Sequence, residues 1–67
     1  MDNSTTHLIP TAVHNVQAGD QIVMGSEVWT IKGLDGPDRI GTYDLFLTDN
    51  LGHSKLAIAN GIVTLVR

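Results

Sequence analysis

Apolar and polar residues alternate with a period of two in short segments of this chain, and turn-forming residues separate the segments. No segment repeats apolar residues at helical spacing over more than one turn. Such alternation is typical of strands that bury one face, so it predicts an all-β protein. The predicted strands are residues 21–24, 27–34, 43–48, 55–59 and 62–66.

Turn-forming residues mark the connections around the first two strands. Gly19 supplies a positive φ and Asp20 a carboxylate that can accept from nearby backbone N–H groups, so we expect both to serve a turn rather than a ligand. Gly25 and Ser26 lie between two apolar runs at a spacing of two residues. This spacing predicts a tight hairpin with glycine at the first turn position.

The later connections differ in length. Residues 33–42 contain three glycines and one proline and are expected to form the longest loop. Residues 48–53 predict the next turn, in which Asn50 or Gly52 takes the left-handed conformation. Asn60 and Gly61 predict a type I′ hairpin before the last strand, with a short helical turn as the alternative.

Five short antiparallel strands in a chain of 67 residues are expected to close into a small barrel, because closure removes exposed strand edges. Residues 12–67 then form the barrel domain, and residues 1–11 form a flexible N-terminal lead-in. An extended piece over residues 12–16 would let Val13 cover one end of the core. A chain of this length can bury only one compact core.

The alternation also assigns the two faces of each strand. The predicted core has these members: Ile22, Trp29, Ile31, Leu45, Leu47, Leu56 and Ile58. Other apolar residues point outward, and the last strand is apolar on both faces. One interior cannot take both faces, so we expect an association surface with Phe46 as its aromatic anchor. Its candidate residues are Phe46, Val23, Val28, Val63 and Leu65.

Composition indicates whether the chain folds and in which compartment it is expected. Apolar residues make up 42% of the chain and charged residues 16%, as in a folded domain. No apolar run approaches the ~20 residues of a membrane span, and the polar N-terminus lacks the basic start of a signal peptide. We therefore expect a cytoplasmic protein with no membrane partner. The chain has no cysteine, which excludes disulfides and thiolate metal ligands.

The number and distribution of charged residues indicate which class of partner the protein could bind. The net charge is −3, and the basic residues are spread along the chain: Lys32, Arg39, Lys55 and Arg67. Nucleic-acid binding draws much of its affinity from clustered cations that neutralise phosphates. The charge distribution therefore disfavours a nucleic-acid partner and leaves a protein partner or self-association.

The sequence offers no catalytic constellation, so we expect no enzymatic activity, no catalytic residue and no cofactor. The histidines His7, His14 and His53 match no metal-ligand spacing. Four aspartates do not follow the pattern of a calcium loop: Asp35, Asp38, Asp44 and Asp49. The segment L-D-G-P-D-R, residues 34–39, is expected to be a turn-forming loop instead.

Four runs carry a family resemblance: "V-x-A-G-D-x-I", "V-W-T-I", "Y-D-L-F-L-T-D-N-L-G-H" and "V-T-L-V". Over residues 13–66 the chain resembles the small SH3-like β-barrel proteins of the phage and bacterial accessory type. The resemblance implies the SH3-like fold and carries over no catalytic or ligand-binding residue. The chain has only three aromatic residues, so the aromatic groove by which SH3 domains bind proline-rich peptides is not expected.

These observations predict a non-enzymatic module that binds a protein or assembles with itself, of a kind that phages encode as accessory proteins. The alternative is a nucleic-acid-associated SH3-like barrel, which rests on fold analogy. A salt series separates the two. Affinity for nucleic acid that falls steeply with salt supports the alternative, whereas no binding at about 50 mM salt removes it.

Overall fold

The computed structural model describes residues 7–67 and confirms an all-β protein. Its strands are β1 Leu8–Ala12, β2 Gln21–Met24, β3 Glu27–Asp35, β4 Tyr43–Thr48, β5 Ser54–Ala59 and β6 Ile62–Val66. The 3-10 turn η1, Val13–Asn15, is the one helical element in this part of the chain. No helix among the described residues is long and apolar enough to cross a membrane.

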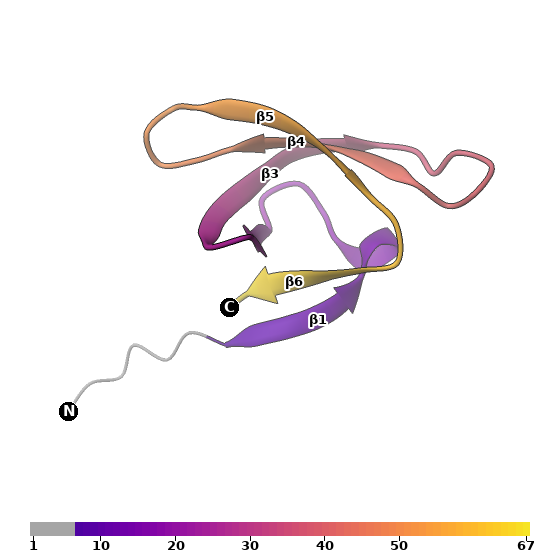
Figure 1. The fold of residues 1–67 in the computed structure, drawn as a ribbon, viewed down its shortest axis with the longest axis horizontal. Helices are drawn as coiled ribbons and strands as arrows, with labels where there is room; N and C mark the ends of the chain where they lie inside the picture. Colours follow the sequence, from indigo (N-terminus) through magenta and orange to yellow (C-terminus); the bar gives the residue numbers. More distant parts are fainter. Residues whose placement is uncertain (1–6) are drawn as a thin grey trace.

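The strands form one antiparallel sheet in the order β1-β6-β2-β3-β4-β5. The sheet bends so that β3, β4 and β5 lie over β6 and β1 (Figure 1). β1 and β5 are its two edges and do not pair with each other, so the sheet has six strands and is open. The sequence predicted five strands. These are β2 to β6, and the sixth is β1.

β1 corrects the predicted lead-in, residues 1–11. Residues 1–6 lie outside the described residues, but Leu8–Ala12 pair antiparallel with β6, from Leu8 opposite Val66 to Ala12 opposite Ile62. Pro10 is one reason that the sequence did not predict this strand, since proline is disfavoured inside strands. Proline is accepted at the edge of a sheet because its missing N–H can face away from the neighbouring strand.

Residues 12–16 were expected to be extended, but a 3-10 turn over Val13–Asn15 interrupts them. The turn carries the chain from β1 toward the corner before β2. The N–H of Val13 donates to the carbonyl of Gly61 at 2.8 Å, which anchors the turn beside the start of β6. Val13 is buried in the core, as the sequence predicted.

The core confirms most of the predicted interior. Ile22, Trp29, Ile31, Leu45 and Leu47 are all buried, and they pack with Val13, Val16, Ala57 and Leu65. The prediction is wrong for Leu56 and Ile58, which are 56% and 71% exposed. Ala57 takes the inward position because it pairs with Leu45, and opposed residues of paired strands share a face.

The predicted hairpin at Asn60 and Gly61 is also wrong. β5 pairs with β4, and β6 pairs with β1 and β2, so the two residues form a bend between strands that are not neighbours. Gly61 has a φ of 91°, and no residue other than glycine has a positive φ in the described chain, which excludes a type I′ turn. The side-chain N–H of Asn60 donates to the Ile40 carbonyl and the Thr42 hydroxyl, both at 3.1 Å.

Candidate protein-interaction site

Three apolar side chains form an exposed surface on the outer face of β4 and β5. Phe46 pairs with Leu56 across the two strands, and Asp44 pairs with Ile58 in the adjacent position. Phe46, Leu56 and Ile58 are 46%, 56% and 71% exposed. We call these three residues the apolar shelf. On β3 the residue opposite Phe46 is Gly33, so no side chain of that strand covers the phenyl ring from this position.

Charged residues flank the apolar shelf at its two ends. At one end Asp35, Asp44 and Ile58 lie side by side in successive strands. At the other end Lys32 occupies the β-bulge between Ile31 and Gly33, and with Phe46 and Leu56 it lines a hollow of about 350 Å³. The shelf is therefore acidic at one end and basic at the other.

β5 is an edge strand, so one side of its backbone has no neighbouring strand. Natural edge strands are commonly protected by proline, by charged side chains or by a bulge. β5 contains no proline, and its register with β4 runs without interruption from Ser54 to Ala59. Its one charged residue, Lys55, folds its ammonium over the ring of Trp29, 4.9 Å from the ring centroid. The edge of β5 is consequently open along its length.

A hollow of about 310 Å³ lies between β5 and β6, on the inner side of the same edge. Buried Ile22, Leu45 and Ala57 contribute to its lining, together with Met24 and Val63. We call this hollow the apolar slot. β5 and β6 are not neighbours in the sheet, since β6 pairs with β1 and β2.

Of the five residues predicted to form the association surface, some are exposed and others are packed in or against the core. Phe46 and Val28 are both 46% exposed, as predicted, and Val23 is half-buried opposite Val28 on the neighbouring strand. Val63 packs against the core, and Leu65 is buried at 3% exposure, so the outward orientation proposed for these two is wrong. Their placement follows from β2, where Ile22 points inward and pairs with Leu65.

The sequence contained a signal for the missed residues Leu56 and Ile58. The segments D-R-I-G-T, residues 38–42, and D-N-L-G-H, residues 49–53, share the pattern D-x-(I/L)-G-x at the two ends of β4. The second is a loop of five residues that pairs Thr48 with Ser54. This odd loop length puts Leu56 on the face of Phe46, since opposed residues share a face.

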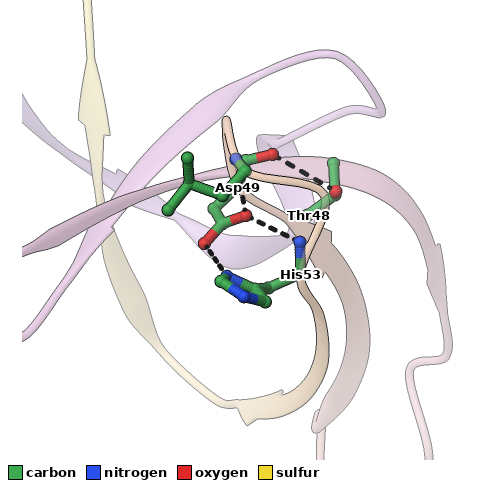
Figure 2. Close-up of polar contacts among 4 residues, drawn as sticks. Thr48, Asp49 and His53 are labelled. Carbon is green, nitrogen blue, oxygen red and sulfur yellow. Dashed lines mark hydrogen bonds and ion pairs between the residues drawn. The ribbon is translucent and has the colours of Figure 1, made fainter.

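The two segments also form the same loop. In each, the aspartate carboxylate accepts from the backbone N–H groups two and four residues later, at 2.8 to 3.0 Å. In each, the aspartate N–H donates to the carbonyl four residues later. Figure 2 shows the second loop, where Nδ1 of His53 lies 2.9 Å from Oδ2 of Asp49. The loops hold Ile40 and Leu51 outward at 75% and 80% exposure.

The loop bonds lower the pKa of Asp49 below its ordinary value of 3.8. Desolvation of the carboxylate acts in the opposite direction and raises the pKa. This effect is outweighed by hydrogen bonds from the His53 side chain and from the N–H groups of His53 and Leu51, and by the Coulombic interaction with His53. The carboxylate therefore stays ionised to a lower pH in the folded loop than in an unfolded chain.

We expect this loop to loosen in acid. Because the folded pKa of Asp49 is depressed, its stabilising contribution is present above the unfolded pKa near 4 and is lost as the pH falls through the folded value. An NMR titration from pH 6 to 2 should show the Leu51 and His53 amide signals move together below pH 4. In Asp49→Asn this joint transition should be absent, and its persistence there would assign the transition to another group.

Of the remaining candidates for chemistry, three aspartates act as turn formers. Asp20 accepts from the N–H of Gln17 at 2.9 Å, and Asp38 and Asp49 each close their own loop. His7 lies beside Arg67 through two backbone hydrogen bonds, whereas His53 lies against Asp49. Within residues 7–67 no three histidine or acidic side chains converge as metal ligands would.

The features that could bind a partner therefore lie together at β5. This strand has an open edge, the apolar shelf on its outer face and the apolar slot on its inner face. Val23 and Val28 form a smaller outward pair on β2 and β3. No protein-family model, no curated protein and no solved structure matches this chain.

Proposed function

We propose that the protein is a non-enzymatic interaction module that binds an extended protein segment along the edge of β5. The observation that carries the proposal is the position of β5 as an open edge between the apolar shelf and the apolar slot. A strand added to such an edge gains main-chain hydrogen bonds, which supply affinity. Its side chains alternate between the two faces, so one set lies on the shelf and the other enters the slot.

The flanking charges specify the segment further. Asp35 and Asp44 lie at one end of the shelf, and neither makes an ion pair within the described residues. A partner segment with apolar residues at alternate positions and a basic residue at the Asp44 end would complement this surface. Complementary charge of this kind raises the association rate and fixes the register more than it raises affinity.

We also infer that β2 to β6 form an SH3-like barrel with an open seam, of the type found in phage and bacterial accessory proteins. Two features support the inference. β2, β3, β4 and β5 run as an antiparallel meander, and β6 returns to pair with β2, where Ile22 meets Leu65. β1 is then a strand added to β6, so the open seam lies between the edge strands β5 and β1, while the apolar slot lies between β5 and β6.

The placement of the cations does not favour the nucleic-acid alternative. Nη2 of Arg67 lies 3.6 Å from Oδ1 of Asp20, and Lys55 lies over Trp29. Two of the four basic residues are therefore engaged by the chain itself. A protein partner uses the exposed apolar surface instead.

The proposal can be tested by selecting peptides from a random library of extended ten-residue segments on the immobilised protein. We expect the selected peptides to shift the amide NMR signals of residues 54–60. Ile58→Lys should weaken their binding at least tenfold, because the lysine interrupts the apolar shelf. Leu8→Lys is the matched control, since Leu8 is also exposed, at 60%, but lies on β1 at the opposite edge of the sheet.

One result would contradict the proposal. It is a set of selected peptides that bind both variants alike, or whose shifts map to another part of the surface. Ile58 and Leu8 are both exposed, so both variants are expected to fold, and circular dichroism checks this before binding is measured.

A further inference from the structure

We propose that the β5 edge binds β5 of a second copy of the chain, antiparallel and about a twofold axis that passes beside Ala57. This inference rests on the proposed function, because it names the partner of the same edge. The resulting homodimer joins the two sheets through their β5 strands and places the two apolar shelves next to each other. The residues that decide the register are Leu56, Ala57 and Ile58.

Self-complementarity around Ala57 is the first argument. A twofold interface uses the same surface of both copies, so residues at equal distances from the axis meet. Two of the three pairs around Ala57 are alike: Leu56 and Ile58 lie one residue from it, and Ser54 and Asn60 lie three residues from it. Lys55 and Ala59, two residues from it, differ. An axis at Ala57 therefore pairs each Leu56 with Ile58 of the second copy and each Ser54 with Asn60.

The outer faces stay matched in this arrangement. Opposed residues of antiparallel strands share a face, and Leu56 and Ile58 both lie on the outer face with Phe46. The two apolar shelves then meet across the axis, from Phe46 through Leu56 to Ile58 and onward to Asp44 of the second copy. The exposed parts of four aliphatic side chains become covered, which supplies the driving force.

Charge is the second argument, and it selects this axis over its neighbours. Asp35, Asp44 and Ile58 lie side by side across β3, β4 and β5. An axis at Ile58 would place this acidic row in line with the same row of the second copy. The axis at Ala57 instead aligns it with the uncharged row of Gly33, Phe46 and Leu56, so like charges are kept apart.

An axis at Leu56 would match the exposed apolar side chains of the two copies poorly. It would set Leu56 against its own copy and leave Ile58 opposite Ser54, so the most exposed aliphatic side chain of the shelf would face a hydroxyl. Of the three adjacent axes that preserve the faces, Ala57 gives the best match of both charge and hydrophobicity.

Lys55 is compatible with this pairing. An inward-pointing charge on an edge strand can prevent another strand from adding to it. Here the ammonium of Lys55 already lies over Trp29, 4.9 Å from the ring centroid. In the proposed register the residue opposite Lys55 is Ala59, whose small side chain leaves room for the lysine stem.

Sedimentation equilibrium on the full chain tests the dimer. We expect wild type to sediment as a dimer at about 100 μM, and Ile58→Lys and Phe46→Ser to raise the dissociation constant at least tenfold. Leu8→Lys should leave it within twofold of wild type, since Leu8 lies on β1 at the opposite edge of the sheet. A wild type that is monomeric at this concentration, or variants at Ile58 and Leu8 that behave alike, would overturn the inference.

Engineered cysteines test the register, and the absence of native cysteine makes them unambiguous reporters. Directly opposed residues on paired strands are close enough for a disulfide, whereas residues offset by two positions are not. A mixture of Leu56→Cys and Ile58→Cys chains, one of them isotope-labelled, should oxidise mainly to the mixed dimer. Predominant linkage of Leu56→Cys to itself would overturn the Ala57 axis.

The outcomes separate this inference from the proposed function. A monomeric wild type that still selects peptides at residues 54–60 overturns the homodimer and retains the interaction module. A dimer that resists Ile58→Lys and selects no peptide at the edge overturns both.

Discussion

Replacing Leu45 with alanine is expected to lower the free energy of unfolding by about 2 to 5 kcal/mol. Leu45 is 1% exposed on β4, where it pairs with Leu34 on one side and Ala57 on the other. The substitution removes buried methyl groups and leaves a cavity that a rigid sheet cannot close. A chain of this length has a total stability of only about 3 to 10 kcal/mol, so a large fraction of the variant should be unfolded.

Urea unfolding followed by circular dichroism measures this loss, with Leu51→Ala as the control. Leu51 is the same residue type at 80% exposure in the loop after β4, and its truncation should change stability by less than about 0.5 kcal/mol. Equal effects at the two positions would place Leu45 outside the core and would contradict the inward face assigned to β4.

The second large effect is expected at Gly36, in the loop between β3 and β4. Its φ is 130°, a conformation that side-chain-bearing residues rarely adopt. A Cβ at this position would lie 2.9 Å from the carbonyl oxygen of Thr42 and 3.2 Å from Cα of Tyr43. Both are backbone atoms and cannot rotate away, so Gly36→Ala should cost about 2 to 5 kcal/mol from strain and overlap together.

Gly61→Ala separates those two contributions. Gly61 has a positive φ of 91°, but a Cβ there meets nothing within 4 Å. Its cost should therefore come from backbone strain alone, about 1 to 2 kcal/mol, and Gly61→Val should exceed 1 kcal/mol. Thermal or urea unfolding of the alanine variants compares them directly. A Gly36→Ala variant no less stable than Gly61→Ala would show that the loop can move away from the added carbon.

The strands of the central meander could be predicted from sequence because alternation and turn chemistry agree there. β2, β4 and β6 have the predicted bounds, and β3 and β5 are each one residue longer. Gly25, at the first position of the β2–β3 turn, has the positive φ of 65° that the predicted hairpin needs. Each of these features depends on neighbouring residues, which a sequence displays directly.

The features that sequence did not predict depend on contacts between distant residues. Asn60-Gly61 has a strong local preference for a hairpin, but β6 instead pairs with β2, more than forty positions earlier, where Ile22 meets Leu65. Burial of Leu65 in the core outweighs the local turn preference. β1 was missed for the same reason, because its only partner in the sheet is β6 at the other end of the chain.

The candidate site could be predicted only in part. Phe46 and Val28 were assigned outward by alternation along their own strands, and both are exposed. For β5 alternation offered two faces, and hydrophobicity favoured Leu56 and Ile58 as the buried set. The register with β4 decided otherwise, and that register depends on a five-residue loop held by the Asp49 carboxylate.

Pro10 on β1 has a consequence for how many copies can join. The sheet formed by residues 8–66 has two edges, and a subunit that paired at both would polymerise into a filament without a defined end. A proline interrupts the row of donors along β1, whereas β5 has none. With pairing through β5, as proposed, each subunit is monofunctional in the polymer chemist's sense. Growth then terminates after one addition, and the dimer is a closed product rather than the first step of a fibre.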